Sequence, residues 1–337
     1  MIVIFGEGKG WFNTCFKEVS GDANIIVSQD CYSPFQKSKI ERFFFHLVFH
    51  PKLGAGNKRD DVIAKLLYRK VCVDMRKKCS DKTVLIFNRT NHLSHNRKFL
   101  SQVKKEKRYK MVYWFTDIVE AVMETEPDIL DICNSYYDNV VTYDPEDAQK
   151  YGFHYVETPY SKLNAEIKTN ASLKTDLFYV GKAKMSTDPL RFQKIISVYE
   201  KARKLGLTTE FYVFDVPEQL QLYKEEIHYN CFLPYETVVK KIQESRCILE
   251  ITQCGERGTT LRFFEAIAYQ KKLLFSNAKL SQHKLFNGNH MKLLTFDSKG
   301  EVIFEEEFIR NTDEISYDNE AFLSPYRFLD EIVDLLR

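Results

Sequence analysis

The chain has 337 residues, a length that accommodates two domains of ordinary size. A hydrophobic fraction of 44% and a charged fraction of 28% are typical of a globular protein, and no stretch approaches the roughly 18–20 apolar residues needed to cross a bilayer. The net charge of only +2 hides an asymmetry, because residues 31–110 hold 21 Lys/Arg against 6 Asp/Glu, whereas residues 117–147 hold 10 Asp/Glu and no Lys/Arg.

Short apolar runs alternate with amphipathic segments along the first half of the chain. Such alternation predicts a parallel sheet covered by helices on both faces. The first run has no basic leader and no cleavage site, so we expect no signal peptide and a cytoplasmic location. The expected strands are 2–5, 24–28, 83–88, 110–117 and 139–144, and the expected helices are 37–50, 62–78, a basic helix to about Lys107, 128–136 and 145–152.

A polar connection at 157–175 predicts a domain boundary, after which the alternation resumes. We therefore expect domains at 1–160 and 161–325, with a C-terminal helix at 326–337 that packs back on the first domain. The fold class predicted is α/β, with two Rossmann-like domains. In the second half we expect strands at 176–181, 210–215, within 227–235, 247–252 and 272–276, and helices at 190–206, 216–226, 237–246 and 261–270.

The segment 247–277, CILEITQCGERGTTLRFFEAIAYQKKLLFSN, is the most informative part of the chain. Arg262 falls in the first turn of a short helix, where the helix dipole disfavours a cation. An anion held by the loop amides and Arg262 would reverse that cost. Glu265 follows three residues later on the same helix edge, so a phosphate and sugar hydroxyls could be bound together. The alternative is a surface ion pair between Arg262 and Glu265.

Cysteine and histidine spacing predicts neither a disulfide framework nor a metal site. The eight cysteines contain no CxxC pair, and the eight histidines contain no HExxH pattern. We expect reduced cysteines buried in the core, no metal and no cofactor.

The second half resembles the donor-binding domain of GT-B glycosyltransferases. The resemblance lies in DLFYVGKAK, LRFQ, FLPYETVVKKIQESRCILEI and GTTLRFFEAIAYQKKLLFSN, taken in order, and covers roughly residues 138–277. More narrowly, the chain is similar to bacterial capsule and lipopolysaccharide glycosyltransferases. This resemblance implies two Rossmann-like domains facing across a cleft, a nucleotide-sugar donor and metal-independent sugar transfer. Eight residues separate Glu256 from Glu265, where the retaining pattern has seven, so the stereochemistry stays open.

The predicted donor site gathers around the ends of strands in the second domain. Gly181 ends a strand, and cations follow it closely. Each of these residues also has a structural alternative. Thr260 is equally explained as a helix N-cap, and Lys182, Lys184 and Arg191 as exposed side chains of a strand-to-helix turn. Phe232 and Tyr235 could belong to an apolar turn that packs on the core. The resemblance implies that Arg262 neutralises the diphosphate and that Glu265 binds ribose. The remaining predicted donor-binding residues are Gly181, Lys182, Lys184 and Arg191 for phosphate, Gly258, Thr259 and Thr260 for diphosphate, and Phe232 and Tyr235 for the base.

An inverting reaction would also need a base in the first domain. Asp117 is the candidate, because it ends a predicted strand that faces the cleft, and His92 and His95 in a polar loop are the next candidates. An ordinary turn or cap residue is the alternative for Asp117. The glycine loop at 5–10 resembles a phosphate cradle but lacks the dinucleotide-binding spacing.

Residues 31–110 set the predicted partners. Their basic excess would attract an anionic membrane surface or a phosphorylated acceptor, and the alternative is a solvated basic face with no partner. The aromatic helix 37–50 could lie at the headgroup boundary of a membrane, and the alternative is packing in the core. No nucleic-acid module accompanies the charge. The predicted function is sugar transfer to a surface glycan, lipid-linked, by a protein peripheral on the inner membrane face. The alternatives are a nucleotide-sugar epimerase, a glycerophosphate-type transferase and a non-catalytic glycan-assembly subunit.

Overall fold

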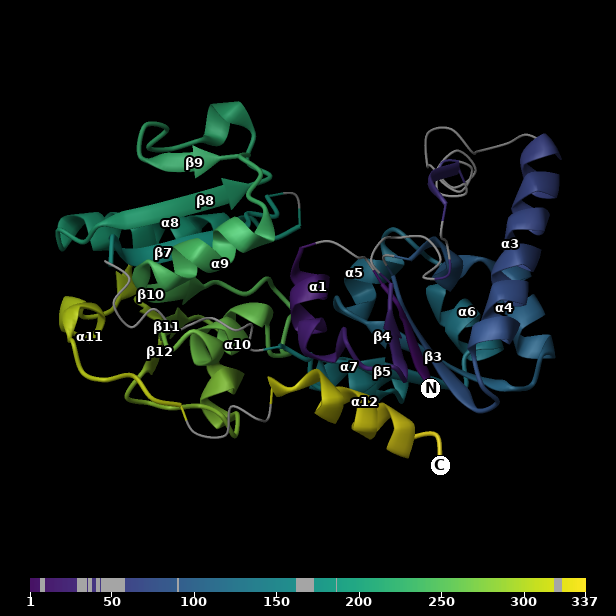
Figure 1. Cartoon of the computed structure of the whole chain (residues 1–337). Coiled ribbons are helices and arrows are strands. Elements are labelled where there is room, and N and C mark those ends of the chain that lie inside the picture. Colours follow the sequence, from purple (N-terminus) through teal and green to yellow (C-terminus); the bar gives the residue numbers. More distant parts are fainter. Residues whose placement is uncertain are drawn as a thin grey trace. The chain divides into compact units, whose positions relative to one another are not determined.

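The computed structural model describes residues 1–6, 10–28, 35, 38–40, 43, 58–89, 91–161, 173–185, 187–317 and 323–337, with the backbone alone at 58–65 and 92 (Figure 1). Most of the helix expected at 37–50 and the centre of the glycine loop lie outside these residues. The chain divides into two compact units, one formed by Met1–Ser161 with Pro325–Arg337 and the other by Lys162–Ser324.

A six-stranded parallel sheet forms the centre of the first unit, in the order β2-β1-β3-β4-β5-β6. Apolar residues fill its inner strands, and Thr83–Asn88 is buried along its whole length. The chain runs from β1 outward to β2 and then crosses to β3 on the other side of β1. The strands are β1 (Ile2–Phe5), β2 (Ile25–Val27), β3 (Thr83–Asn88), β4 (Tyr109–Phe115), β5 (Asn139–Thr142) and β6 (His154–Tyr155).

Helices of very different length surround this sheet. Capping explains where some begin and end: Asp144 accepts backbone N–H groups of Glu146 and Asp147, and Gly152 ends the same helix in a left-handed conformation (φ 71°). The helices are α1 (Trp11–Cys15), η1 (Lys17–Val19), α3 (Lys58–Lys78), η2 (His92–His95), α4 (Arg97–Lys105), α5 (Val119–Met123), α6 (Ile129–Tyr136), α7 (Pro145–Tyr151) and α12 (Pro325–Asp334).

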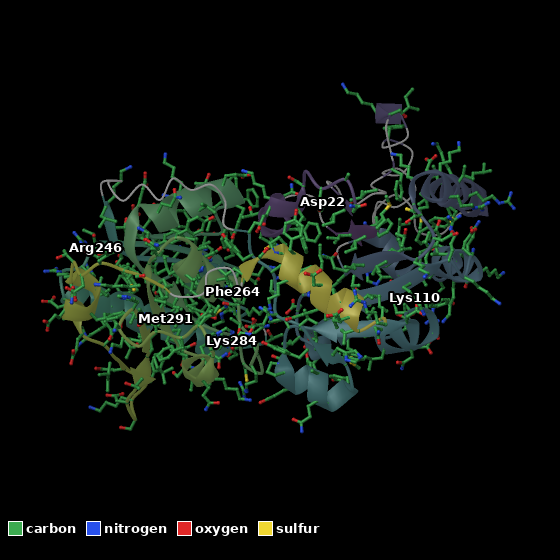
Figure 2. The ribbon with its side chains drawn as sticks, turned by 60° about the horizontal axis from the view of Figure 1, so that its bottom comes forward. Asp22, Lys110, Arg246, Phe264, Lys284 and Met291 are labelled. Carbon is green, nitrogen blue, oxygen red and sulfur yellow. The ribbon has the colours of Figure 1, made fainter. Side chains whose placement is uncertain are left out.

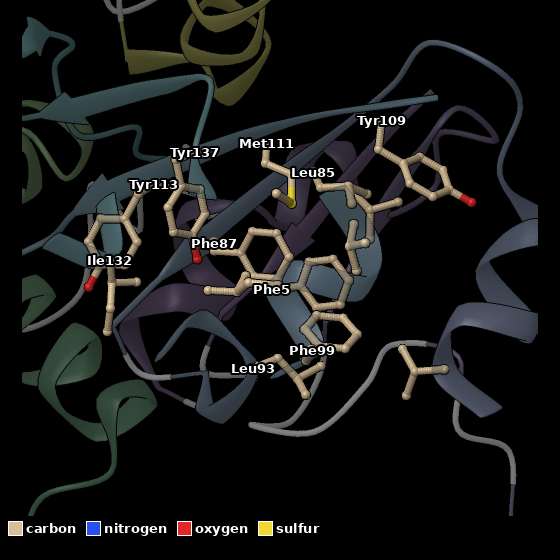
Figure 3. Packing of buried hydrophobic residues seen from close by; sticks show 14 of the residues in the cluster. Phe5, Leu85, Phe87, Leu93, Phe99, Tyr109, Met111, Tyr113, Ile132 and Tyr137 are labelled. Carbon is tan, nitrogen blue, oxygen red and sulfur yellow. The ribbon is translucent and has the colours of Figure 1, made fainter. Parts of the chain in front are cut away.

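Aromatic rings dominate the core of the first unit (Figure 3). Phe5 of β1 stacks on Phe87 of β3 with ring centroids 4.4 Å apart, and Phe99 meets Phe87 edge-on. Tyr113 and Tyr137 lie beside them, also edge-to-face. Such arrangements add to the burial of large apolar areas, so this sheet is held by ring packing as well as by its hydrogen-bond ladder.

The C-terminal helix α12 packs within the first unit although the second unit precedes it in the chain. Phe328 is 2% exposed, and its ring lies 4.8 Å from Trp114 and 5.8 Å from Phe16. The Arg327 guanidinium donates to the buried carboxylate of Glu157 at 3.2 Å. The helix therefore completes the hydrophobic cover of this sheet.

The second unit holds another six-stranded parallel sheet, in the order β12-β11-β10-β7-β8-β9. From β7 the chain winds outward to β9 and then returns to β10 on the other side of β7, so its direction reverses between these two central strands. Ligands of open α/β sheets bind at such a reversal, beside the carboxyl ends of the strands. The strands are β7 (Thr175–Lys182), β8 (Thr209–Phe214), β9 (Ile227–Tyr229), β10 (Ser245–Glu250), β11 (Lys272–Phe275) and β12 (Met291–Leu293), with a separate pair β13 (Thr295–Phe296) and β14 (Val302–Ile303).

Helices cover both faces of the second sheet (Figure 1). One face packs against α8, and the other against α9 and α10. Phe264 of α10 and Met291 of β12 lie buried inside the unit (Figure 2). The helices are α8 (Pro189–Lys204), η3 (Glu218–Leu220), α9 (Tyr235–Gln243), α10 (Leu261–Ala268), η4 (Ala278–Gln282) and α11 (Glu306–Arg310).

One predicted helix is absent, and several short elements were not predicted. The polar segment 216–226 contains only the single turn η3, because Leu220 and Leu222 are exposed and Tyr223 adopts a left-handed backbone (φ 54°) that ends a helix. The helix expected at 237–246 ends at Gln243, and Ser245 already belongs to β10. The unpredicted elements are α1, α5, α11, β6, β12, β13 and β14.

Candidate functional site

Side chains at the carboxyl ends of β7 and β10 join the loops that follow these two strands. The Lys184 ammonium donates a hydrogen bond to Oε1 of Gln253, linking the two loops directly. Asp188 caps α8 by accepting from the backbone N–H of Arg191 at 3.2 Å, and its second oxygen accepts from the N–H of Cys254 at 2.6 Å. These hydrogen bonds therefore connect the loop after β7 and the start of α8 with the loop after β10, at the point where the strand order reverses.

A pocket of about 390 Å³ opens among these loops. It combines cations, carboxylates and backbone groups of the loop after β10 with the first turns of α8 and the segment after β11. This composition suits a polar, anionic ligand more than an apolar one. Its lining residues are Asp188, Leu190, Lys194, Thr252, Gln253, Cys254, Gly255, Glu256, Arg257, Ser276, Asn277, Ala278 and Lys279.

Arg262, Glu265 and Tyr235 form one hydrogen-bonded group at the start of α10. The Arg262 guanidinium donates to Oε2 of Glu265, and the Tyr235 hydroxyl donates to Oε1 of Glu265 at 2.5 Å. A second Arg262 nitrogen lies 3.4 Å from the backbone carbonyl of Val180 on β7. The Arg262–Glu265 ion pair thus exists, but it is not a surface pair: the side chains are 16% and 1% exposed.

Burial raises the pKa of the Glu265 carboxyl, and the neighbouring Arg262 and Tyr235 lower it again in part. Each oxygen of the carboxylate accepts a hydrogen bond from a protein donor. Glu265 therefore fixes the direction of the Arg262 guanidinium and of the Tyr235 ring. The spacing of these residues in the sequence did not indicate that role.

Thr260 occupies the N-cap position of α10, but its hydroxyl caps nothing. It donates instead to Oε1 of Glu250, the last residue of β10, at 2.6 Å. Thr260 therefore holds the N-cap position that the alternative expected, but without the side-chain hydrogen bond of a cap. Thr259 and Gly258 are buried beside it, and the Asn277 amide lies 3.4 Å from the carbonyls of Arg257 and Gly258.

Glu250 is a buried residue of this site that the sequence analysis did not single out. It is 4% exposed, and burial raises the pKa of its carboxyl to about 7, although Thr260, Arg262 and Arg191 all favour the ionised form. Its signal in the sequence was an acid at the end of an otherwise apolar strand, CILEI. A carboxylate in a strand covered on both faces requires a partner, and this argument could have found it.

Tyr179 and Arg191 complete a polar group beneath the loops. Burial raises the pKa of the Tyr179 hydroxyl, and the nearby Arg191 guanidinium lowers it in part. Within the described residues, Oε2 of Glu250 in this group is buried and has no hydrogen-bond partner. An unsatisfied carboxylate oxygen in a buried polar group is costly and points to a functional site.

The local role of Gly181 is to make room for Tyr179. A Cβ atom at Gly181 would lie 2.6 Å from the Tyr179 hydroxyl oxygen. In the same way, a Cβ at Gly6 would lie 2.1 Å from the Phe12 ring, so this glycine of the first loop is required by packing. Lys182 is exposed at the end of β7, whereas Lys184 is half-buried and engaged with Gln253.

The loop between β9 and α9 holds the predicted base-binding residues. Phe232 is 83% exposed, so it is not the core-packing residue that the apolar-turn alternative supposed. Tyr235 begins α9 and points its hydroxyl at Glu265. An exposed ring in the loop after a parallel strand can stack on a planar ligand.

In the first unit, Asp117 follows β4 at its carboxyl end. The side chain is half-buried, and its Oδ1 accepts the backbone N–H of Ile118 at 3.1 Å. His92 begins η2, and its side chain lies outside the described residues. His95 lies 2.8 Å from both the Ser94 hydroxyl and the Arg89 carbonyl and 3.0 Å from the Glu126 carboxylate. These contacts tie His95 into a structural network.

In the described part of the chain, no helix is long and apolar enough to span a membrane. No group of three or more His, Cys, Asp or Glu residues there is arranged to hold a metal ion. All cysteines in that part are free, and Cys231 and Cys254 are exposed while the others are buried.

Comparison with solved structures gives the fold class. An α,α-trehalose-phosphate synthase (UDP-forming) from Burkholderia vietnamiensis is 9% identical over 83% of this chain and 85% of its own, with a TM-score of 0.50. A trehalose-6-phosphate synthase, OtsA, is 11% identical over 83% of this chain and 86% of its own, with the same TM-score. No protein-family model and no curated protein matches the sequence.

At these identities the likeness concerns the fold. It confirms the predicted α/β class with two Rossmann-like domains of the GT-B type. The two matches do not support the narrower resemblance to capsular and lipopolysaccharide glycosyltransferases, which stays a prediction.

Proposed function

We propose that the chain is a glycosyltransferase whose second unit binds a nucleoside-diphosphate sugar. The observation that carries the proposal is the buried group of Arg262, Glu265 and Tyr235 at the start of α10, beside the reversal of strand order. The GT-B fold and the ordered motifs of the second half support the same reading. Both matched proteins are trehalose-phosphate synthases, and the one from Burkholderia vietnamiensis is named as UDP-forming, so UDP-glucose is the first donor to test.

The main catalytic requirement of sugar transfer is to stabilise the charge that develops in the transition state. When the bond between sugar and diphosphate breaks, negative charge grows on the leaving phosphate oxygen. Arg262 and Arg191, with the amides of the loop 251–260, are fixed near the place where that charge forms. Preoriented cations and amides of this kind lower the barrier without reorganising at the moment of reaction. We propose that they act in place of a metal ion.

Orientation of the nucleoside follows from the same elements. The exposed Phe232 ring provides a stacking surface for the base. Glu265 fixes Arg262 for the diphosphate, and its remaining lone pairs can accept from ribose hydroxyls, since an ionised carboxylate has about four acceptor sites. Gly258, Thr259 and Thr260 line the approach to the diphosphate. Asp117 remains the proposed base for an acceptor hydroxyl in an inverting reaction.

Binding and turnover separate this proposal from its alternatives. A panel of nucleotide sugars is screened by thermal shift and calorimetry, and the ligand that binds is then incubated with a sugar phosphate and with a lipid-linked glycan in parallel. A transferase consumes the donor and glycosylates one acceptor. An epimerase interconverts free donors, a glycerophosphate-type transferase uses a different activated donor, and an assembly subunit does none of these. The proposal fails if no nucleotide sugar binds.

Substitution tests the site itself. Arg262→Ala is expected to weaken nucleotide-sugar binding by about 10- to 100-fold, the equivalent of one lost charge-assisted hydrogen bond. Arg310→Ala is the matched control, because Arg310 lies in the same unit and, among the described residues, donates only to the backbone carbonyls of Leu205 and Gly206. Equal calorimetric affinities of wild type and Arg262→Ala would contradict the assignment.

We also propose that the outward face of α3 contacts an anionic membrane surface. This face combines exposed Leu66 and Val73 with exposed Arg69, Lys70 and Lys77. Basic residues near such a surface contribute about 1 kcal/mol each. Co-sedimentation with phosphatidylglycerol vesicles should therefore exceed that with phosphatidylcholine and fall in the Arg69→Ala/Lys77→Ala variant. Equal sedimentation with both lipids would show a merely solvated basic face.

A further inference from the structure

Glu250 has a position that the proposed charge stabilisation does not explain. It ends β10, the central strand next to β7, and its side chain is almost completely buried. Oε1 accepts the Thr260 hydroxyl at 2.6 Å, while Oε2 has no hydrogen-bond partner among the described residues. A buried ionised carboxylate with a free oxygen is expensive unless cations compensate it.

Two guanidinia provide this compensation, one from each side of the strand. Arg262 approaches on α10 and Arg191 on α8, and both favour the ionised form of Glu250. Glu256 opposes it, and the buried Tyr179 hydroxyl lies in the same polar group. Among the described residues, these are the charged and titratable groups with the largest effect on the carboxyl. Because burial outweighs the cations, the pKa of Glu250 is raised to about 7.

The same two cations are the proposed ligands of the donor diphosphate. An ionised Glu250 therefore competes with the diphosphate for Arg262 and Arg191. A bound pyrophosphate adds negative charge beside the carboxyl and disfavours its ionised form further. Protonation of Glu250 from solvent removes the competition and leaves both guanidinia to the ligand.

We propose that Glu250 is a positioning residue of the donor site that takes up a proton when the pyrophosphate of a nucleotide sugar binds. The inference rests on the proposed function and adds a proton to its binding step. Linkage gives the sign of the effect: if the complex holds more protons than the free protein, donor affinity falls as pH rises above the ligand-free pKa. Thr260, anchored to Glu250, keeps its place at the start of α10 in both protonation states.

Calorimetry with UDP-glucose measures this proton directly. The pyrophosphate diester of UDP-glucose stays fully ionised between pH 6 and 8, so the ligand adds no titration of its own. Titrations at pH 7.5 in buffers of different ionisation enthalpy should show an uptake of about half to one proton, and the affinity should fall about fivefold between pH 7 and pH 8. The wild-type measurement requires no substitution.

The Glu250→Gln variant assigns the proton to this residue. Glutamine keeps the shape and an acceptor for Thr260 but cannot titrate. The variant should bind UDP-glucose with little proton uptake and little pH dependence, and at pH 8 it should bind more tightly than wild type. A role confined to structure would weaken binding equally at all pH values. Glu157→Gln, a buried ion-paired glutamate of the first unit, serves as control and should retain the wild-type uptake.

The outcomes distinguish this inference from the function on which it rests. Binding of UDP-glucose with no proton uptake in the wild type overturns the role of Glu250 and leaves the donor site standing. Uptake that persists unchanged in a folded Glu250→Gln protein overturns it as well. If neither UDP-glucose nor any other nucleotide sugar binds, the proposed function falls and this inference falls with it.

Discussion

Glu250 and Glu265 bring two buried carboxyl groups close to the start of α10, and their surroundings differ. Glu265 has a partner for each oxygen, whereas Glu250 has one hydroxyl donor and a free oxygen. Burial raises the pKa of both groups. At the scale of single residues, burial therefore disfavours the ionised form of both carboxyl groups, and an anionic ligand or a change in pH can change their protonation.

The pH dependence of stability should reveal Glu250. The pKa of this carboxyl is about 7 in the folded protein and about 4.5 in the unfolded chain, so the folded state binds the extra proton between these values. Its contribution to stability is complete below about pH 4.5 and is lost as pH rises to 7, an effect of about 3 kcal/mol. Denaturant unfolding of Glu250→Gln should lose correspondingly less stability from pH 5 to 8 than wild type. Parallel pH profiles for the two proteins would contradict the assignment.

Gly181 allows a sharper test of packing at the same site. Gly181→Ala places a Cβ 2.6 Å from the Tyr179 hydroxyl oxygen and should destabilise the protein by about 1–3 kcal/mol through overpacking. Tyr179→Phe removes that oxygen, so the double variant should recover part of the loss. Chemical denaturation of the two single variants and the double variant forms a complete cycle. Additive effects would show that the hydroxyl does not restrict this glycine.

Some residues of the site could be predicted from sequence because their spacing carries the signal. Arg262 and Glu265 are three residues apart on a short helix, and the structure brings them together. Glu250 and Tyr179 were missed because each lies in an apolar strand, where the pattern reports burial but not which polar groups meet at the strand ends. The contact of Tyr235 with Glu265 spans 30 positions of the sequence, so no local pattern could indicate it.

At the scale of elements, long segments were predicted well and short ones poorly. The strand 83–88 has the predicted bounds because its apolar run is continuous, and α7 has a proline at its start and a glycine at its end. Elements of two to five residues, such as α5 and β12, present too few positions for a period to show. Segment 216–226 has polar residues that are compatible with a helix, but the unit buries no apolar face of it. Because tertiary packing stabilises most helices, only the single turn η3 forms there.

Helix α12 provides the prediction at this scale. Phe328→Ala removes a ring that packs on Trp114 and Phe16 and should destabilise the first unit by about 3–5 kcal/mol. The matched control on the same helix is Tyr326→Ala, whose side chain is 39% exposed and which should cost less than about 1 kcal/mol. Denaturant unfolding followed by Trp fluorescence measures both. Comparable losses in the two variants would mean that α12 adds little to this core.

At the scale of the whole molecule, each unit has its own sheet and its own hydrophobic core. The chain has only two tryptophans, Trp11 and Trp114, and both belong to the first unit. Their rings lie 6.4 Å apart, within the aromatic cluster beneath α12. Trp fluorescence therefore reports on the first unit alone, while calorimetry and circular dichroism report on both units.

Because the two signals report on different units, they show which unit a ligand binds. If the donor binds to the second unit alone, UDP-glucose at 100 times its dissociation constant should stabilise that unit by about 2.7 kcal/mol. The calorimetric transition of the second unit should rise in temperature, and the Trp-detected midpoint of the first unit should stay unchanged. In Arg262→Ala, whose affinity is expected to be about 10- to 100-fold lower, the same concentration is only about 1 to 10 times the new dissociation constant, so the stabilisation of the second unit should fall to about 0.4–1.4 kcal/mol. A Trp-detected midpoint that rises together with the calorimetric one would show that the first unit also gains energy from the donor, and the site would then have to include residues of both units.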